Sequence, residues 1–398
     1  MSLPRYPTYK DSEVEWLGEV PDHWDVCALK RVVVMQSGES ITGESIEETG
    51  LYPVFGGNGL RGYTSDFTHD GRFALIGRQG ALCGNVNYGS GRFWASEHAV
   101  VATPAKSVDT TWLGEMLRAM NLNQYSVAAA QPGLSVDLVG RIGVAVPPLT
   151  EQAHIAAFLA RETAKIDALV AEQQRLIELL KEKRQAVISH AVTKGLNPAA
   201  AMKGSGIAWL GEVPRHWEVK AIKRFSTLQR GHDLTDAERT DGTYPVVTSG
   251  GISGTHGCFM ARGPGVVTGR YGSTGRLFYI EGDFWPHNTS LYVSNFHNNS
   301  PRFVWYSLQT VDFAAHSAKA AVPGIDRNDI HVLPAVVPPI SEQSKIVTYL
   351  DAITAKLDSL TSEAQRAIAL LQERRTALIS AAVTGQIDVR PAAERASA

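Results

Sequence analysis

Two long stretches of the chain place apolar side chains at helical spacings between polar ones. In residues 151–192 the apolar positions recur at intervals of 3, 4 and 7, and neither proline nor glycine interrupts them before Gly195. Pro147 and Pro148 exclude helix immediately before this stretch, and Thr150 can cap its first turn. The pattern predicts a single helix of roughly 63 Å at about 1.5 Å per residue, and such a rod needs a partner helix.

The partner is expected within the same chain, because residues 147–193 recur as residues 338–384. Of 47 aligned positions, 25 are identical at an offset of 191. The apolar positions coincide, so we expect the two helices to pack on each other as an antiparallel coiled coil. The predicted seam consists of Ile155, Leu159, Ile166, Leu169, Leu176, Leu180, Ile346, Leu350, Ile353, Leu357, Leu360 and Leu371.

A second repeated element opens each half of the chain. Residues 16–31 match residues 209–224 at 12 of 16 positions, including the run Trp-Leu-Gly-Glu-Val-Pro and a later His-Trp pair. Tryptophans flanking a proline turn are large apolar anchors. We therefore expect each segment to attach the start of a domain to its body, with His23 and His216 in structural roles.

Between these repeated elements the pattern changes to short β-prone runs separated by glycines, with one short helical insert in each half. The sequence thus predicts an α+β protein with a pseudo-twofold internal repeat, in which two mixed, mainly β domains are separated by two long helices. The expected boundaries are 1–146 for the first domain, 147–193 for its helix, 194–205 for a linker, 206–337 for the second domain, 338–384 for its helix and 385–398 for a tail.

Composition places few limits on function. The net charge is −2, and residues 1–150 carry 11 basic against 16 acidic side chains, so overall charge does not indicate a nucleic-acid binder. Three widely spaced cysteines predict no metal site and fit a reducing cytoplasm. The first residues lack a signal-peptide core and no apolar run approaches a membrane span, so we expect a cytoplasmic protein.

The motifs of several enzyme classes are absent from the sequence. An amino-methyltransferase needs Asp or Asn before a Pro-Pro pair and an aromatic residue after it, whereas both Pro-Pro pairs follow valine and precede leucine or isoleucine. No Gly-Lys dipeptide occurs, which excludes a phosphate-binding loop. We therefore expect a chain without catalytic residues of its own.

The order of these parts resembles the specificity subunit of type I restriction-modification systems. The resemblance rests on the duplicated entry segment, a Gly-Arg-x-Gly turn at 77–80 and 269–272, a Pro-Gly turn at 132–133 and 323–324, and the Val-Pro-Pro helix entries. It implies that each β domain is a target recognition domain for one half of a bipartite DNA site. The helices would then pair as a spacer and dock the modification subunits.

The resemblance also implies the partners and cofactors. These are double-stranded DNA, two copies of a modification (methyltransferase) subunit, and restriction (translocase and endonuclease) subunits, with no membrane. S-adenosylmethionine, ATP and Mg would be held by the partner subunits and none by this chain. Two alternatives stay open: a non-catalytic coiled-coil scaffold whose β domains bind protein, and a carbohydrate-binding or hydrolytic β protein.

Candidate DNA contacts lie in the glycine-flanked turns, where the backbone can approach DNA and side chains can reach base edges. Arg78 and Arg270 occupy the same turn in both halves, which favours phosphate binding, while their neighbours Gln79 and Tyr271 differ and are better candidates for base choice. Contact of the entry-segment tryptophans with DNA is a less favoured alternative. The full set is Asn58, Arg61, Arg78, Gln79, His98, Gln131, Ser135, Ser249, Ser253, Arg270, Tyr271, Ser273, Asn288, Thr289 and Lys319.

Overall fold

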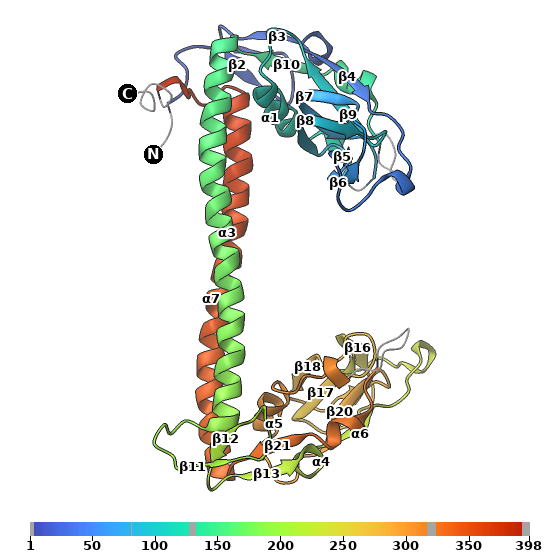
Figure 1. Ribbon diagram of the computed structural model, residues 1–398, viewed down its shortest axis with the longest axis vertical. Coiled ribbons are helices and arrows are strands. Elements are labelled where there is room, and N and C mark those ends of the chain that lie inside the picture. Colours follow the sequence, from blue (N-terminus) through green and yellow to red (C-terminus); the bar gives the residue numbers. More distant parts are fainter. Residues whose placement is uncertain (1–3, 81, 127–132, 317–323, 392–398) are drawn as a thin grey trace. The chain divides into compact units, whose positions relative to one another are not determined.

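The computed structural model describes residues 4–80, 82–126, 133–316 and 324–391 (Figure 1). The chain divides into two compact units, one formed by Met1–Gln173 and Arg366–Ala398, the other by Gln174–Gln365. The long helices α3 (Leu149–Lys194) and α7 (Ile340–Val383) contribute to both units. Each unit combines a mixed β domain with one part of each helix, which confirms the predicted α+β repeat.

The first unit is built around a six-stranded sheet with the order β4-β9-β7-β8-β5-β6. Helix α1 lies against this sheet, and the Asp109 side chain caps it by accepting from the backbone N–H groups of Thr111 and Trp112 (Figure 1). The sheet strands are β4 (Val33–Ser37), β5 (Tyr52–Gly56), β6 (Gly59–Thr64), β7 (His69–Gly77), β8 (Val86–Ala95) and β9 (Ala99–Pro104). The other elements are β1 (Tyr9–Asp11), β2 (Glu19–Pro21), β3 (Asp25–Ala28), β10 (Gly143–Val146), α1 (Thr110–Ala119), α2 (Val136–Gly140) and 3-10 turns at Leu29–Arg31, Gly43–Ser45 and Leu122–Tyr125.

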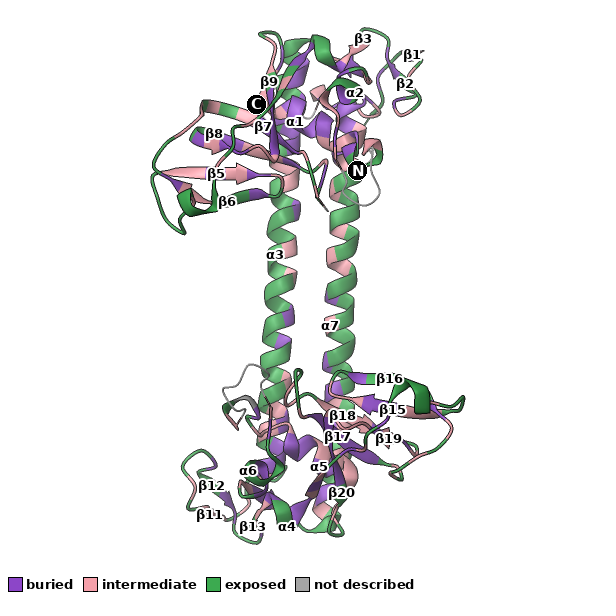
Figure 2. Cartoon of the chain, turned by 90° about the vertical axis from the view of Figure 1, so that its right-hand side faces the viewer, coloured by how far each residue is buried: buried purple, intermediate pink, exposed green. Residues whose placement is uncertain are grey.

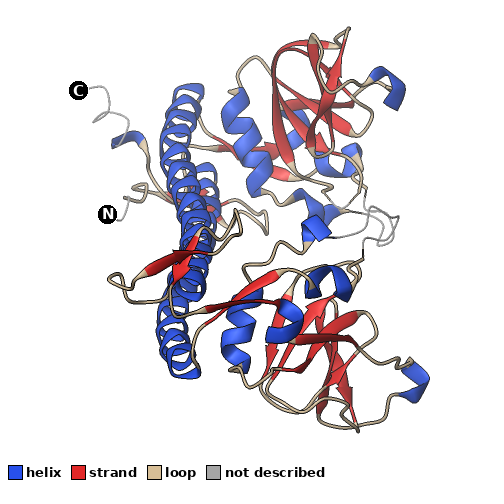
Figure 3. Cartoon of the chain, turned by 60° about the horizontal axis from the view of Figure 1, so that its bottom comes forward, coloured by secondary structure: helices blue, strands red, loops and turns tan. Residues whose placement is uncertain are grey.

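The second unit repeats this plan but divides the sheet in two, with orders β14-β20-β17-β18 and β16-β15-β19. The division follows from the interruption of one strand: β8 of the first unit is continuous, whereas β18 and β19 are separate here. Both units combine strands with short helices (Figure 3). The strands are β14 (Thr227–Arg230), β15 (Tyr244–Thr248), β16 (Gly251–His256), β17 (Gly265–Gly269), β18 (Leu277–Ile280), β19 (Trp285–Pro286) and β20 (Ser290–Asn295). The other elements are β11 (Met202–Gly204), β12 (Glu212–Pro214), β13 (Glu218–Ala221), β21 (Pro334–Val337), α4 (Ile222–Phe225), α5 (Pro301–Leu308), α6 (Arg327–His331) and 3-10 turns at Asp236–Glu238 and Ala314–His316.

The two long helices pair antiparallel in each unit. In the first, Ile155 and Leu159 of α3 share a buried cluster with Ile379 and Val383 of α7, and Asp167 pairs with Arg375 further along. In the second, Ile188 and Val192 of α3 share a cluster with Ile346 and Leu350 of α7, and Arg184 pairs with Asp358. Most other helix positions are exposed (Figure 2).

The predicted seam is right at its ends and at Ile166, Leu180 and Leu357, but three of its leucines are wrong. Leu169, Leu176 and Leu360 are 45%, 42% and 39% exposed, whereas Ile177 is 8% exposed. The observed seam passes through half-buried or buried residues at 163, 166, 170, 173, 177, 180 and 184, which alternate intervals of 3 and 4. Leu169 and Leu360 therefore lie beside the seam, and an aspartate at either position would face solvent.

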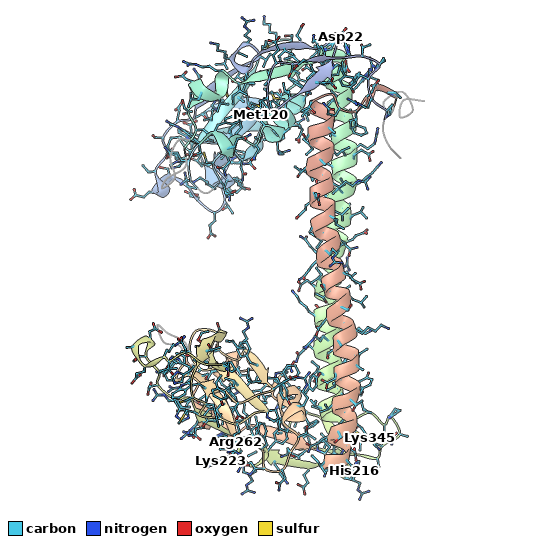
Figure 4. The ribbon with its side chains drawn as sticks, turned by 180° about the vertical axis from the view of Figure 1, so that it is seen from behind. Asp22, Met120, His216, Lys223, Arg262 and Lys345 are labelled. Carbon is cyan, nitrogen blue, oxygen red and sulfur yellow. The ribbon has the colours of Figure 1, made fainter. Side chains whose placement is uncertain are left out.

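The entry segments attach each β domain to the start of its long helix through their second tryptophan, whereas Trp209, expected as an anchor, is 57% exposed. Trp24 and Trp217 are fully buried, and the adjacent histidines reach a helix glutamate: His23 Nε2 lies 2.8 Å from Glu151 and His216 Nε2 lies 2.6 Å from Glu342. In the second unit His216 and Lys345 lie together at one end of the paired helices (Figure 4). Both histidines thus have the structural role predicted for them.

The residue after each of these glutamates ties the long helix to the short helix of the same unit. The Gln152 side chain accepts from the Asp109 backbone N–H at 2.8 Å, immediately before α1. The Gln343 side chain accepts from the Ser300 backbone N–H at 2.9 Å, immediately before α5. Each amide also donates to the carbonyl of the first proline of its Pro-Pro pair, which orients the domain on its helix.

Two of the expected boundaries differ from the structure. Strand β11 lies inside the range assigned to the linker, where it pairs with β12 just as β1 pairs with β2. The segment after α7 packs on the first unit: Val389 is fully buried, and the Asp388 N–H donates to the Pro4 carbonyl at 2.8 Å. The chain beyond Thr384 is therefore part of the first unit at least as far as Arg390, which bonds to Asp388.

Candidate nucleic-acid interface

A hollow of about 400 Å³ opens on the first β domain. It lies where the β5–β6 turn, the segment after β7 and the β8–β9 turn meet. It is lined by Gly57, Asn58, Arg61, Gln79, Leu82 and His98. Four of the predicted DNA-contact residues therefore converge, although they come from three separate segments of the chain.

The backbone around this hollow is tightly fixed. The Arg78 N–H donates to the His98 carbonyl at 2.9 Å, and the Arg78 carbonyl accepts from Leu134 N–H at 3.0 Å. A Cβ on Gly77 would collide with the Gly57 carbonyl, and one on Gly57 would lie 3.2 Å from the His98 carbonyl oxygen. Glycine is required here because three backbone segments approach one another closely.

The second unit holds its predicted residues in the same arrangement. The Arg270 N–H donates to the Thr289 carbonyl at 2.9 Å, and the Arg270 carbonyl accepts from Ile325 N–H at 3.0 Å. Thr289 therefore occupies the position of His98, and Tyr271 that of Gln79. The hairpin registers, Gly56 opposite Gly59 and Thr248 opposite Gly251, make Ser253 the counterpart of Arg61.

We call the turns that meet in this way the rim of each unit. In the second unit, several side chains of the rim contact neighbouring residues. The Arg270 guanidinium lies 4.5 Å from the centre of the Tyr271 ring, a cation–π distance. Thr289 Oγ1 accepts from the Ser249 N–H at 3.3 Å and lies 3.1 Å from His287 Nδ1. The side chains of Arg270 and Thr289 thus have partners within the second unit.

The remaining candidates are placed differently. The Ser253 carbonyl accepts from Arg239 Nη1 at 3.0 Å, and Ser273 lies against Gly269, where a Cβ would collide with its carbonyl. The Ser135 hydroxyl accepts from Leu138 N–H at 3.4 Å and caps α2, so it has a structural task besides any ligand contact. Gln131 and Lys319 lie outside the described residues.

Sequence reasoning missed two carboxylates beside these rims. Glu97 Oε1 lies 3.1 Å from His98 Nε2, and Asp233 accepts from the Asn288 amide and from Arg230 at 3.0 Å. The hydrogen bond from Asn288 lowers the pKa of Asp233, with the charge of Arg230 acting in the same direction. Glu97 could have been suspected because it precedes the candidate residue His98. Nothing in the sequence pattern marks Asp233, which lies 55 positions from Asn288.

Within the described part of the chain, no helix is long and apolar enough to cross a membrane. No group of three or more His, Cys, Asp or Glu side chains there is placed to hold a metal ion. The chemistry that the described residues of both units offer here is hydrogen bonding and charge.

Comparison with known proteins identifies the family. A family model described as type I restriction modification DNA specificity domain matches twice, at residues 21–179 and 214–369. The chain therefore belongs to this family, and each match covers most of one β domain and the first part of its long helix.

Two relatives from Escherichia coli illustrate how far the likeness extends. The type I restriction enzyme EcoprrI specificity subunit is 43% identical over 156 residues, which is 38% of this chain and 37% of that protein. The type I restriction enzyme EcoDI specificity subunit is 20% identical over 416 residues, covering 95% of this chain and 91% of that protein. A solved chain from work on complex assembly and conformational transition of the type I R-M system has the same fold, with TM-score 0.70 and 14% identity over 92% of this chain and 98% of that one.

Proposed function

We propose that this chain is the DNA specificity subunit of a type I restriction-modification complex, in which each β domain recognises one half of a bipartite target. One observation carries the proposal. Within each unit, equivalent turns are joined by the same backbone hydrogen bonds, yet their side chains differ between the units: Gln79 against Tyr271 and His98 against Thr289. A shared scaffold with divergent polar residues suits two domains that bind DNA similarly and select different bases.

The long helices are proposed to set the spacer and to dock the modification subunits. Two duplicated leucine positions support docking, because Leu169 and its counterpart Leu360 are 45% and 39% exposed, and Leu179 and its counterpart Leu370 are 51% and 58% exposed. Exposed leucines repeated at an offset of 191 are not needed for the helix seam. Two equivalent surfaces would bind two copies of one modification subunit.

Chemical steps are assigned to the partner subunits. Specificity subunits in this family are generally non-catalytic. S-adenosylmethionine would be bound by the modification subunits, and ATP and Mg by the restriction subunits. This chain would contribute target choice and the geometry of assembly.

Methylation-sensitive sequencing of DNA from cells that express this chain with its modification partner tests the proposal. We expect methylation confined to one bipartite motif. A protein-interaction scaffold would give no sequence-dependent methylation, and the assembled complex would show no salt-dependent duplex binding.

Native mass spectrometry tests the stoichiometry and the docking surface together. We expect two modification subunits on the parent chain and weaker occupancy for the Leu169→Asp and Leu360→Asp variants, which should fold normally. Saturation at one modification subunit on the parent would reject the two-surface model.

A further inference from the structure

One apolar position on each recognition rim has no role in the account so far. Leu60 is 54% exposed and Ile252 is 64% exposed, each next to the turn of its hairpin. The registers place Leu60 opposite Phe55 and Ile252 opposite Val247, and a glycine with positive φ precedes each one. The two side chains therefore occupy the same place in the two units.

The hairpin neighbours of these two aliphatic residues differ between the units. Leu60 lies between Asn58 and Arg61, which line the hollow of the first unit. At the corresponding hairpin positions the second unit has Gly250 and Ser253. The polar neighbours have changed, whereas a large exposed aliphatic residue stands at this position in both units.

Packing within the chain does not explain why both units have a large exposed aliphatic residue at this position. A single exposed leucine is ordinary on a protein surface, but a repeated one at the tip of a candidate recognition hairpin is typical of an interaction site. Both residues remain more than half exposed, so neither contributes much to the core of its unit. A partner that covers them must present an apolar group among polar ones.

The edge of duplex DNA has one such group. In the major groove, which admits a two-stranded β-ribbon, the thymine C5-methyl is the apolar feature that distinguishes one base from the other three. We propose that Leu60 and Ile252 each contact a thymine methyl group, one in each half of the target, and so select an A·T pair at one position per half-site. This inference rests on the proposed function and adds two specificity-determining residues to it.

The test measures binding of the full chain, assembled with its modification subunits, to an unmethylated duplex. This duplex carries the motif that methylation-sensitive sequencing identifies. Each thymine of the motif is replaced in turn by deoxyuridine, which lacks only the methyl group. We expect one thymine in each half-site at which the replacement weakens binding about 4-fold, the value for one buried methyl group. Leu60→Ala should weaken binding to the thymine duplex roughly 10-fold. Binding by this variant should no longer depend on whether the first half-site carries thymine or deoxyuridine, while it should still depend on this in the second half-site.

Ile252→Ala should act in the same way in the second half-site alone. The slope of binding against salt should be unchanged in both variants, because a methyl contact releases no counterion. Leu51→Ala and Val332→Ala are matched controls, since these residues are 76% and 75% exposed but lie outside the hairpin turns, and they should leave binding unchanged.

Three results would overturn the inference. One is binding that is indifferent to deoxyuridine at every thymine, and another is an equal loss for Leu60→Ala on thymine and deoxyuridine duplexes. The third is an increase in 2-aminopurine fluorescence at one base step that Leu60→Ala abolishes, which would show a wedge between base pairs instead. Failure of the proposed function would differ from all of these, because the parent complex would then have no bipartite motif to substitute.

Discussion

The Arg184 guanidinium on α3 donates to the Asp358 carboxylate on α7 at 3.1 Å. The same pair recurs with its helices exchanged, since Asp167 on α3 accepts from Arg375 on α7, also at 3.1 Å. An offset of 191 converts each residue of one pair into its counterpart in the other. The duplicated sequence is thus expressed as a duplicated antiparallel register. Both pairs are partly exposed, so they contribute little stability and serve mainly to favour this register.

The corrected seam predicts which helix substitutions destabilise the protein. Ile166 and its counterpart Leu357 are 6% and 5% exposed, so Ile166→Asp and Leu357→Asp bury an unpaired charge. Each should lower the free energy of unfolding by about 3 kcal/mol or more. Leu169→Asp and Leu360→Asp, three positions further along, should change it by less than about 1 kcal/mol. Urea unfolding of the four variants measures this, and equal losses at all four sites would show that the seam is misplaced.

Glu342 should matter through the indole that it satisfies. Burial raises the pKa of Glu342, but hydrogen bonds from Trp217 and His216 outweigh burial and hold the pKa below its usual range. Trp217 is 1% exposed and donates to Glu342 at 2.9 Å, so Glu342→Leu leaves a buried donor unsatisfied and should cost about 1–3 kcal/mol. Glu342→Gln keeps an acceptor and should cost less. Thermal melting, monitored by tryptophan fluorescence, compares the two variants. Identical melting temperatures would contradict the role of Glu342 as the acceptor for Trp217.

The buried histidine His331 predicts a loss of stability in mild acid. Its Nε2 accepts from the Leu228 N–H at 2.9 Å, and burial, followed by the charges of Arg327 and Lys223, lowers its pKa below the ordinary 6.5. Because the folded pKa is the lower one, protonation favours the unfolded chain, and stability should fall as pH drops below about 6.5. The His331→Gln variant should be less stable than the parent at pH 7.5. Its free energy of unfolding should change less between pH 7.5 and pH 5. Parallel stability curves for parent and variant would exclude this group as the cause.

Arg78 and Arg270 are expected to bind DNA phosphates, because their backbones are held identically in the two rims. Arg78→Ala and Arg270→Ala should each weaken binding by a similar factor on specific and unrelated duplexes. Each should also reduce the slope of log affinity against log salt by about one unit. A filter-binding series at several salt concentrations provides the measurement. A loss restricted to one base pair would make these arginines base readers, and unchanged binding would remove them from the interface.

The sequence predicted the architecture because the repeat marks every attachment point. Trp24, Trp217, Glu151 and Glu342 lie in the best-matched segments, and the structure shows why: they join each β domain to its helix. The helix register was harder to predict. Leu169-Val170 and Leu176-Ile177 are adjacent apolar pairs, so either member could face the partner helix, and the predicted seam took the more exposed member of each pair.

The rims were predictable as turns but not as contacts. Asn58, Arg61, Gln79 and His98 were chosen because glycines mark turns at the ends of β-prone runs, and those turns do meet. The pairing of Asp233 with Asn288 could not be predicted, because it depends on how a distant loop folds onto the rim. The contribution of each rim residue to DNA binding stays a prediction.

Exchange of one recognition domain tests the central claim most directly. Residues 32–146 are replaced by the corresponding segment of a relative with a different target, and the methylated motif is determined by methylation-sensitive sequencing in cells that supply the modification subunits. The account predicts a motif in which one half-site changes while the other half-site and the spacer length stay the same. A motif changed in both halves would contradict the claim that each unit reads its own half of the target.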